Sequence, residues 1–124
     1  MDNIIKIFAS EEFGRVRTVI IKGEPWFVLA DVCKALEISN SRMVASRLDS
    51  DELMSVKLTS GGQRRKMTVV SESGLYDVIL RSDKPQAKYF CKWVTTKILP
   101  TIRRTGGYVA NEDMFIENYL PFLD

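Results

Sequence analysis

The sequence predicts one α+β domain, in which a small antiparallel sheet with hairpins packs on several helices. Two observations indicate this class. Alternating β-branched runs dominate the chain before Leu29, whereas apolar residues at helical spacing dominate the stretch from Ala87 to Ile98. The 124 residues are 45% hydrophobic, which suits one compact core without disulfides or metals. We expect the helices to include a helix-turn-helix-like pair and a long C-terminal core helix.

Three extended segments are predicted near the N-terminus. Ile4–Ala9 and Arg15–Lys22 are alternating runs separated by a polar, glycine-containing turn. Gly23 and its neighbour then separate the second run from Pro25–Leu29, and two runs joined across such a break predict a β-hairpin.

A pair of short helices is expected next. Ala30–Glu37 has helical apolar spacing, and Ser39, Asn40 or Ser41 can cap a second helix. In bacterial transcription regulators with a similar two-helix unit, the second helix enters the major groove of DNA.

Arg42 and Arg47 point outward from this second helix and are therefore candidate DNA-binding residues. Glycine is common where Glu37 stands, because the tight turn often needs a positive φ, which is sterically costly for Glu. The alternative is an ordinary pair of core helices.

A basic hairpin is predicted downstream. Glu52–Leu58 and Lys66–Val70 are extended runs, and the glycine-containing loop between them ends in Arg64 and Arg65. With Lys66 they place three positive charges together, as in a wing that lies along a phosphate backbone without reading sequence. The alternative is an exposed hairpin with an ordinary polar tip.

The stretch Asp83–Tyr108 is expected to form the central helix. Asp83 is a candidate N-cap, and Pro85 suits a first turn. Pro100 predicts either a kink or the restart of a second segment, and two glycines after Arg104 end the helix.

This helix is expected to supply both core and basic surface. Further candidate DNA-binding residues on it are Lys88, Lys92, Arg103 and Arg104. Arg103 is either a partner of the helix dipole or a phosphate ligand. A helix capped by Ser71 is expected to pack beside it. Large side chains assigned to the core are Trp26, Phe27, Leu75, Tyr76, Phe90 and Trp93.

Charge and composition limit the function. The net charge is only +2, yet residues 57–108 carry eleven basic and three acidic residues, whereas the remainder carries seven and thirteen. This asymmetry indicates a polyanionic partner; the alternative is a solvated basic face. The absence of histidine excludes Ser-His and Cys-His nucleophile pairs and zinc fingers. We expect no enzyme activity, no cofactor, no metal and no membrane-spanning segment.

Three stretches together resemble the N-terminal domain of the BRO family, found in prophage antirepressors and in large DNA viruses of insects. They are PWFVLADVCKAL (25–36), SESGLYDVILRS (71–82) and AKYFCKWVTTKILPTIRRTGGY (87–108). The resemblance implies a DNA-binding module at residues 1–108. Residues 109–124 are then a linker or the start of a further helical region of a longer protein.

The resemblance also implies a cytoplasmic, prophage-encoded protein of a bacterial host. Its first implied function is the DNA-binding module of an antirepressor-type transcription regulator, with double-stranded DNA as partner. The alternative is a protein-interaction module that captures a phage repressor without binding DNA. Any homo-oligomer is expected to form through the C-terminal region.

Overall fold

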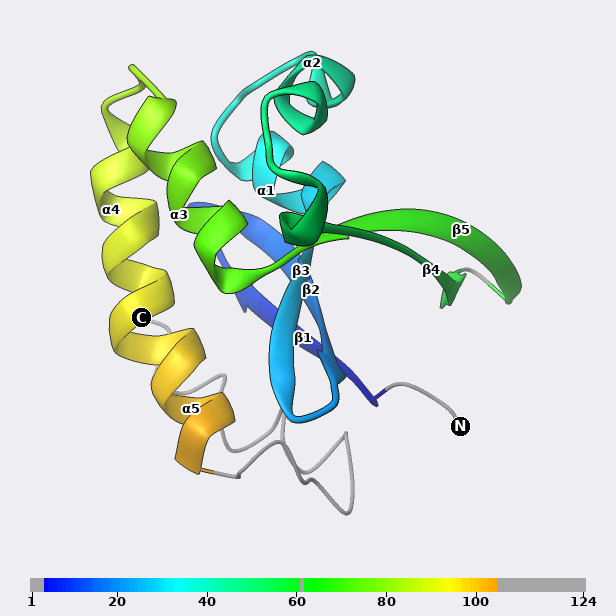
Figure 1. Ribbon diagram of the computed structural model, residues 1–124. Coiled ribbons are helices and arrows are strands. Elements are labelled where there is room, and N and C mark those ends of the chain that lie inside the picture. Colours follow the sequence, from blue (N-terminus) through cyan, green and yellow to red (C-terminus); the bar gives the residue numbers. More distant parts are fainter. Residues whose placement is uncertain (1–3, 61, 105–124) are drawn as a thin grey trace.

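The computed structural model describes residues 4–60 and 62–104, which form a five-stranded antiparallel sheet in the order β1-β2-β3-β5-β4 with helices around it (Figure 1). This confirms the predicted α+β class. The strands are β1 (Ile4–Ser10), β2 (Gly14–Ile21), β3 (Glu24–Val28), β4 (Leu53–Ser60) and β5 (Gln63–Val70). The helices are α1 (Leu29–Ala35), α2 (Ser41–Ser46), η1 (Ser50–Glu52), α3 (Glu72–Arg81), α4 (Gln86–Trp93), η2 (Val94–Ile98) and α5 (Leu99–Arg104).

Short turns fix the register of the hairpins. Lys22 and Gly23 both have positive φ, 53° and 79°, in the two-residue turn between β2 and β3. Both residues of a type I′ turn need this conformation, and its twist matches that of the flanking strands. In the β4–β5 hairpin Ser60 pairs with Gln63, so the strands extend further into the expected loop than the sequence indicated.

The sheet divides into two arms beyond β3. Strand β5 pairs with β3 only at Val69 and Val70, whereas it pairs with β4 along its whole length. Residues 63–68 of β5 therefore leave the sheet with β4 as a two-stranded ribbon, which extends away from β1–β3 (Figure 1). After Val28 the chain enters α1, at the point where the arms separate.

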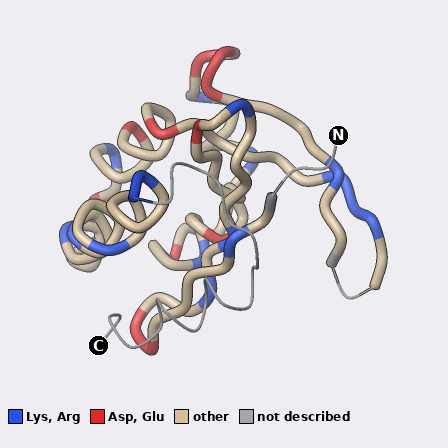
Figure 2. The backbone as a smooth tube through the Cα atoms, turned by 90° about the horizontal axis from the view of Figure 1, so that it is seen from below, with Lys and Arg blue, Asp and Glu red and all other residues tan. Residues whose placement is uncertain are grey.

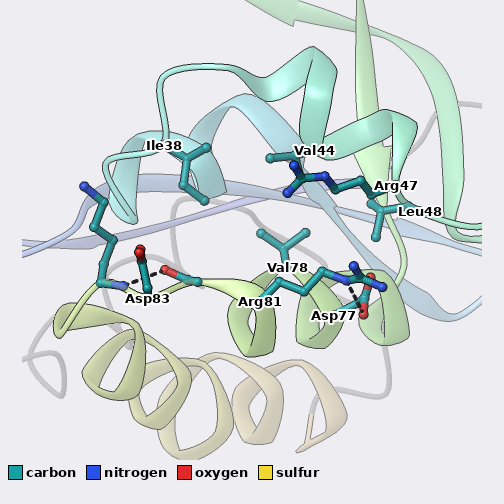
Figure 3. A pocket seen from close by; sticks show the side chains of 10 residues that line it. Ile38, Val44, Arg47, Leu48, Asp77, Val78, Arg81 and Asp83 are labelled. Atoms are coloured by element: carbon teal, nitrogen blue, oxygen red, sulfur yellow. Dashed lines mark hydrogen bonds and ion pairs between the residues drawn. The ribbon is translucent and has the colours of Figure 1, made fainter.

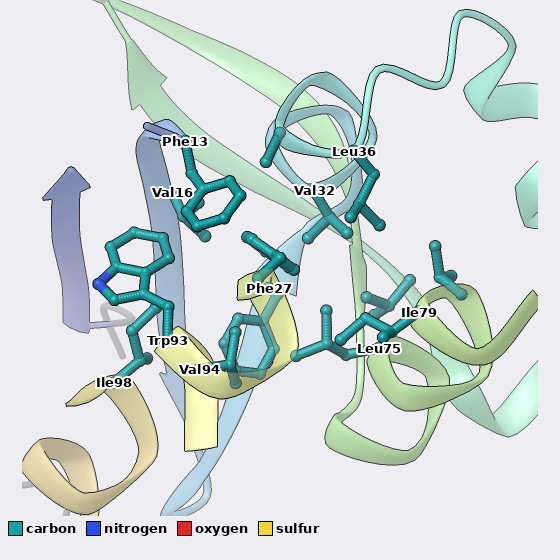
Figure 4. Close-up of a cluster of buried hydrophobic side chains, with 14 of the residues drawn as sticks. Phe13, Val16, Phe27, Val32, Leu36, Leu75, Ile79, Trp93, Val94 and Ile98 are labelled. Atoms are coloured by element: carbon teal, nitrogen blue, oxygen red, sulfur yellow. The ribbon is translucent and has the colours of Figure 1, made fainter. Parts of the chain in front are cut away.

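Two hydrophobic clusters lie on opposite faces of the sheet. The larger one joins β1–β3 to α1, α3 and the C-terminal helix, with Phe27, Phe90 and Trp93 among its members (Figure 4). The smaller one packs Leu58 and Val69 of the ribbon against β2 and β3. Phe27, Leu75, Phe90 and Trp93 are buried as expected, whereas Trp26 and Tyr76 are only partly buried at the margins.

The helix pair follows the sequence prediction closely. Glu37 has a φ of 57°, so the turn after α1 does require the left-handed conformation. Asn40 caps α2, because its side-chain oxygen accepts a hydrogen bond from the backbone N–H of Met43 at 3.0 Å. Arg42 and Arg47 are both exposed on this helix.

The C-terminal helix runs without a break from Gln86 to Arg104, so the chain does not restart as a separate helix at Pro100. Val94–Ile98 is π-helical, and the backbone N–H of Leu99 donates to the carbonyl of Val94, five residues back. The helix thus changes from i→i−4 to i→i−5 hydrogen bonds just before Pro100, which has no N–H to donate.

Asp83 does not cap this helix, which corrects a second expectation. The helix begins at Gln86, and Ser82 instead accepts the backbone N–H of Lys84 through its hydroxyl at 3.2 Å. The cap expected for α3 is confirmed, since the Ser71 hydroxyl accepts from the N–H of Gly74 at 3.1 Å. The expected glycine stop after Arg104 and the tail from 109 to 124 lie outside the described residues.

Candidate nucleic-acid interface

The β4–β5 ribbon has two chemically different faces. Directly paired residues share a face, and successive pairs alternate. Pairs on one face supply the apolar side chains that pack on the sheet, such as Val56 with Met67. The other face carries three consecutive polar pairs, and all six side chains are exposed. These pairs, here called the polar ribbon face, are Ser55–Thr68, Lys57–Lys66 and Thr59–Arg64.

Lys57 and Lys66 lie directly opposite each other at the centre of this face. Like charges at paired positions destabilise a sheet, so this arrangement is unfavourable for folding alone. The segment from Leu53 to Val70 contains four basic residues and no acidic residue. Figure 2 shows basic positions and no acidic ones along this ribbon. The surface is therefore suited to a polyanion.

Helix α2 lies beside the polar ribbon face. Arg42 and Ser41 line a groove of about 280 Å³ together with Lys66 and Thr68 of β5. Arg17 of β2 also lines this groove. We call this groove the basic groove. It brings Arg42 of the helix pair and Lys66 of the hairpin onto one surface, although 24 sequence positions separate them.

Arg17 is held in place by Asp31 of α1. The guanidinium donates to both carboxylate oxygens, with Nε–Oδ2 2.8 Å and Nη2–Oδ1 2.9 Å, and the backbone N–H of Arg17 donates to Oδ2 at 2.9 Å. The hydrogen bond and charge of Asp31 raise the pKa of Arg17, although burial opposes the shift. The cation is therefore fixed rather than mobile. Arg15 and Lys34 line an adjoining depression with this pair.

Arg47 is not on the basic groove. It lines a separate pocket of about 150 Å³ between α2 and α3, whose apolar residues include Ile38 and Val78 (Figure 3). Its guanidinium approaches the sulfur of Met43 at 3.3 Å. The two arginines proposed for one recognition helix thus lie on different flanks of α2.

The remaining candidates divide further. Arg65 alternates to the face opposite the polar ribbon face, where its guanidinium donates to Gln63 at 3.3 Å. Lys88 and Lys92 are exposed on α4, at the opposite side of the molecule from the ribbon in both views (Figures 1 and 2).

Arg103 lies in the last turn of α5, as expected for a partner of the helix dipole, and it also has a specific acidic partner. Its Nη2 atom forms an ion pair with Oε2 of Glu72 at 2.8 Å, which joins α5 to the start of α3. The same oxygen accepts the hydroxyl of Tyr76 at 3.3 Å. Arg104 is exposed at the end of α5, away from the ribbon (Figure 1).

Sequence reasoning missed four residues of this surface: Arg15, Arg17, Lys34 and Lys57. Lys57 could have been found, because strict alternation in a hairpin closed by a two-residue turn pairs it with Lys66. The other three could not, because no local pattern indicates that β2 and α1 face the ribbon.

Residues 4–60 and 62–104 contain no cluster of three His, Cys, Asp or Glu side chains able to hold a metal ion. They also contain no helix that is both long and apolar enough to cross a membrane.

An α+β module with a basic groove beside a β-ribbon is thus the class that fold and site define. Residues 15–100 match the BRO family, N-terminal domain, and the chain belongs to this family. It is 38% identical over 88 residues to an uncharacterized protein of Haemophilus influenzae, covering 70% of this chain and 44% of that protein.

Two proteins of Invertebrate iridescent virus 6, both named as Bro-N domain-containing, are also similar. The match to 289L is 30% identical over 109 residues and covers 73% of this chain and 26% of that protein. The match to 201R is 39% identical over 49 residues and covers 40% and 12%. The chain therefore spans less than half the length of these relatives. No solved structure matches it.

Proposed function

We propose that this chain is the DNA-binding module of a prophage antirepressor-type transcription regulator that acts in the cytoplasm of a bacterial host. The observation that carries the proposal is the Lys57–Lys66 pair, which lies on the same surface as Arg42 and has no acidic residue on its hairpin. A cross-strand pair of like charges is relieved when a polyanion binds, and duplex DNA presents closely spaced phosphates.

The test is a titration of fluorescent duplex DNA with the full chain at several salt concentrations. Log affinity should fall linearly with log salt, with a slope of about −0.9 for each phosphate contacted. Lys57→Gln with Lys66→Gln should lower the affinity strongly. The matched control is Lys88→Gln with Lys92→Gln, which removes the same charge from the opposite side of the molecule and should change little. Equal losses in the two double variants would contradict the proposed surface.

A second candidate function is capture of a phage repressor without DNA binding. The pocket between α2 and α3 favours it, because its lining combines apolar and charged residues and so suits one apolar side chain of a protein partner. On the same helix α3, Leu80 is 82% exposed. If the folded chain binds no duplex at low salt, whereas Arg47→Glu at the exposed edge of the pocket abolishes binding of a repressor, this second function replaces the first.

We propose no catalytic role in either case. The sequence has no histidine, and Asp31, Glu72 and Asp77 are engaged with arginines rather than with each other. The carboxylates of Asp31 and Glu72 join elements of the fold, whereas Asp77 pairs with Arg81 within α3.

A further inference from the structure

We infer that the β4–β5 ribbon, and not helix α2, is the element that reads DNA bases, by entering the major groove with its polar ribbon face. This inference rests on the proposed function and deepens it. The sequence interpretation gives the opposite assignment, with the helix on the bases and the hairpin on the phosphates. The geometry of the two elements supports exchanging these roles.

The ribbon has the dimensions of a groove-reading element. Residues 63–68 of β5 do not pair with β3, so over this length the ribbon consists of β4 and β5 alone. Paired strands lie about 4.8 Å apart, and a major groove about 12 Å wide admits such a ribbon. The ribbon is also held rigidly from behind, because Leu58 is 3% exposed and Val69 is fully buried against β2 and β3. A rigid reader loses little conformational freedom on binding.

The side chains on the polar ribbon face are those that read base edges. Ser55 and Thr68 form one exposed pair, next to the pair of Lys57 and Lys66. Hydroxyl groups can both donate to and accept from bases, and lysine donates to the O6 and N7 atoms of guanine. These two hydroxyls lie together on one side of the lysine pair, where they can add base-edge contacts to those of the lysines.

Helix α2 is poorly suited to the same task. It has six residues, so it is about 9 Å long. Val44 and Ala45 pack against the core, and Arg47 lies on the flank facing α3. Of the two candidate arginines, Arg42 is the one beside the ribbon, where it lines the basic groove with Lys66. With the ribbon in the major groove, this arginine is placed at the neighbouring phosphate backbone.

The experiment selects binders from a pool of duplex DNA with a random central segment, using the full chain. Ser55→Ala with Thr68→Val removes the two hydroxyls and keeps the charge. We expect its selected sequence to differ from that of the wild type, with discrimination reduced by about 5- to 150-fold for each lost base contact. Its affinity for unselected DNA should change little.

Two further variants separate the roles. Arg42→Gln should weaken binding to selected and unselected DNA alike and leave the selected sequence unchanged, because phosphate contacts carry no direct sequence information. Arg65→Gln, on the opposite face of the same ribbon, should leave the selected sequence unchanged. Thermal unfolding of each variant establishes that it is folded.

Three outcomes would overturn the inference. If the hydroxyl variant selects the wild-type sequence with undiminished discrimination, or if Arg42→Gln alone alters that sequence, the ribbon is not the reader. If the wild type binds duplex DNA without any preference, the reading role fails and the proposed DNA-binding function stands. If no duplex DNA is bound, both fail together.

Discussion

Arg17 pairs with Ile7 of β1 on one side, and on the side toward β3 the carboxylate of Asp31 takes the place of a strand partner. Residue 18 of β2 still pairs with Phe27 of β3, but the pairing stops there, because β3 ends one residue later at Val28 and α1 begins at Leu29. The backbone N–H of Arg17 therefore donates to Asp31, and the same carboxylate binds the guanidinium. In the stretch PWFVLADVCKAL (25–36), Asp31 thus has a structural role. It joins α1 to the sheet at the point where the two arms separate.

Asp31→Ala is expected to lower the free energy of unfolding by about 1.5–3 kcal/mol, because it removes the hydrogen bonds that hold a half-buried guanidinium. Urea unfolding measures the loss. The matched control is Asp77→Ala, which breaks the exposed i, i+4 pair with Arg81 and should cost about 0.5 kcal/mol or less. Similar losses in the two variants would show that the Asp31 pair is no more than a surface ion pair.

Trp93→Ala should act through stability. The indole is 7% exposed and stacks on Phe13 with ring centroids 5.6 Å apart. Emptying this site should cost about 3–5 kcal/mol. Among the described residues the indole Nε1 has no hydrogen-bond partner, so Trp93→Phe should retain most of the stability. The melting temperature of both variants is the measurement. An alanine variant that melts like the wild type but binds DNA less tightly would make Trp93 a contact residue.

Glu37→Gly should leave the protein as stable as the wild type or up to about 1 kcal/mol more stable, because glycine adopts the φ of 57° without steric cost. Glu37→Ala is the control, since it removes the same carboxylate but keeps the Cβ atom that causes the strain. Chemical unfolding of the pair isolates the backbone effect. The explanation fails if the glycine variant is no more stable than the alanine variant.

Alkaline pH should destabilise the protein partly through Tyr76. Burial, followed by the charge of Glu72, raises the pKa of this tyrosine above its ordinary value of 10.0. The folded state therefore keeps a proton that the unfolded chain loses first. The contribution of protonated Tyr76 to the free energy of unfolding is complete below about pH 10. It is lost as the pH rises through the pKa that Tyr76 has in the folded state.

Tyr76→Phe removes the titrating group, so the variant should lose less stability between pH 7 and pH 10.5 than the wild type does. Unfolding in urea at both pH values gives the comparison. Parallel losses in the two proteins would assign the alkaline effect to other groups, among them Cys33, whose pKa burial also raises.

The sequence alone determined the elements and most of the core. Alternation, helical spacing and the caps at Asn40 and Ser71 are local signals, because each depends on residues within one or two turns of the chain. For the same reason, the strained turn at Glu37 was predictable. The cap at Asp83 and the helix restart at Pro100 were predicted wrongly. A polar residue before a helix need not cap it, and a π-helical stretch precedes Pro100 in a continuous helix.

The site was decided by the tertiary structure. Nine basic residues were proposed as one group, yet the fold places Lys66 and Arg42 together, turns Arg65 to the other face and moves Lys88 to the far side of the molecule. Charge is visible in a sequence, but the surface on which it lies depends on strand register and on the separation of the two arms. Both are set by contacts between residues far apart in the chain, such as Val28 with Val69, which no local pattern specifies.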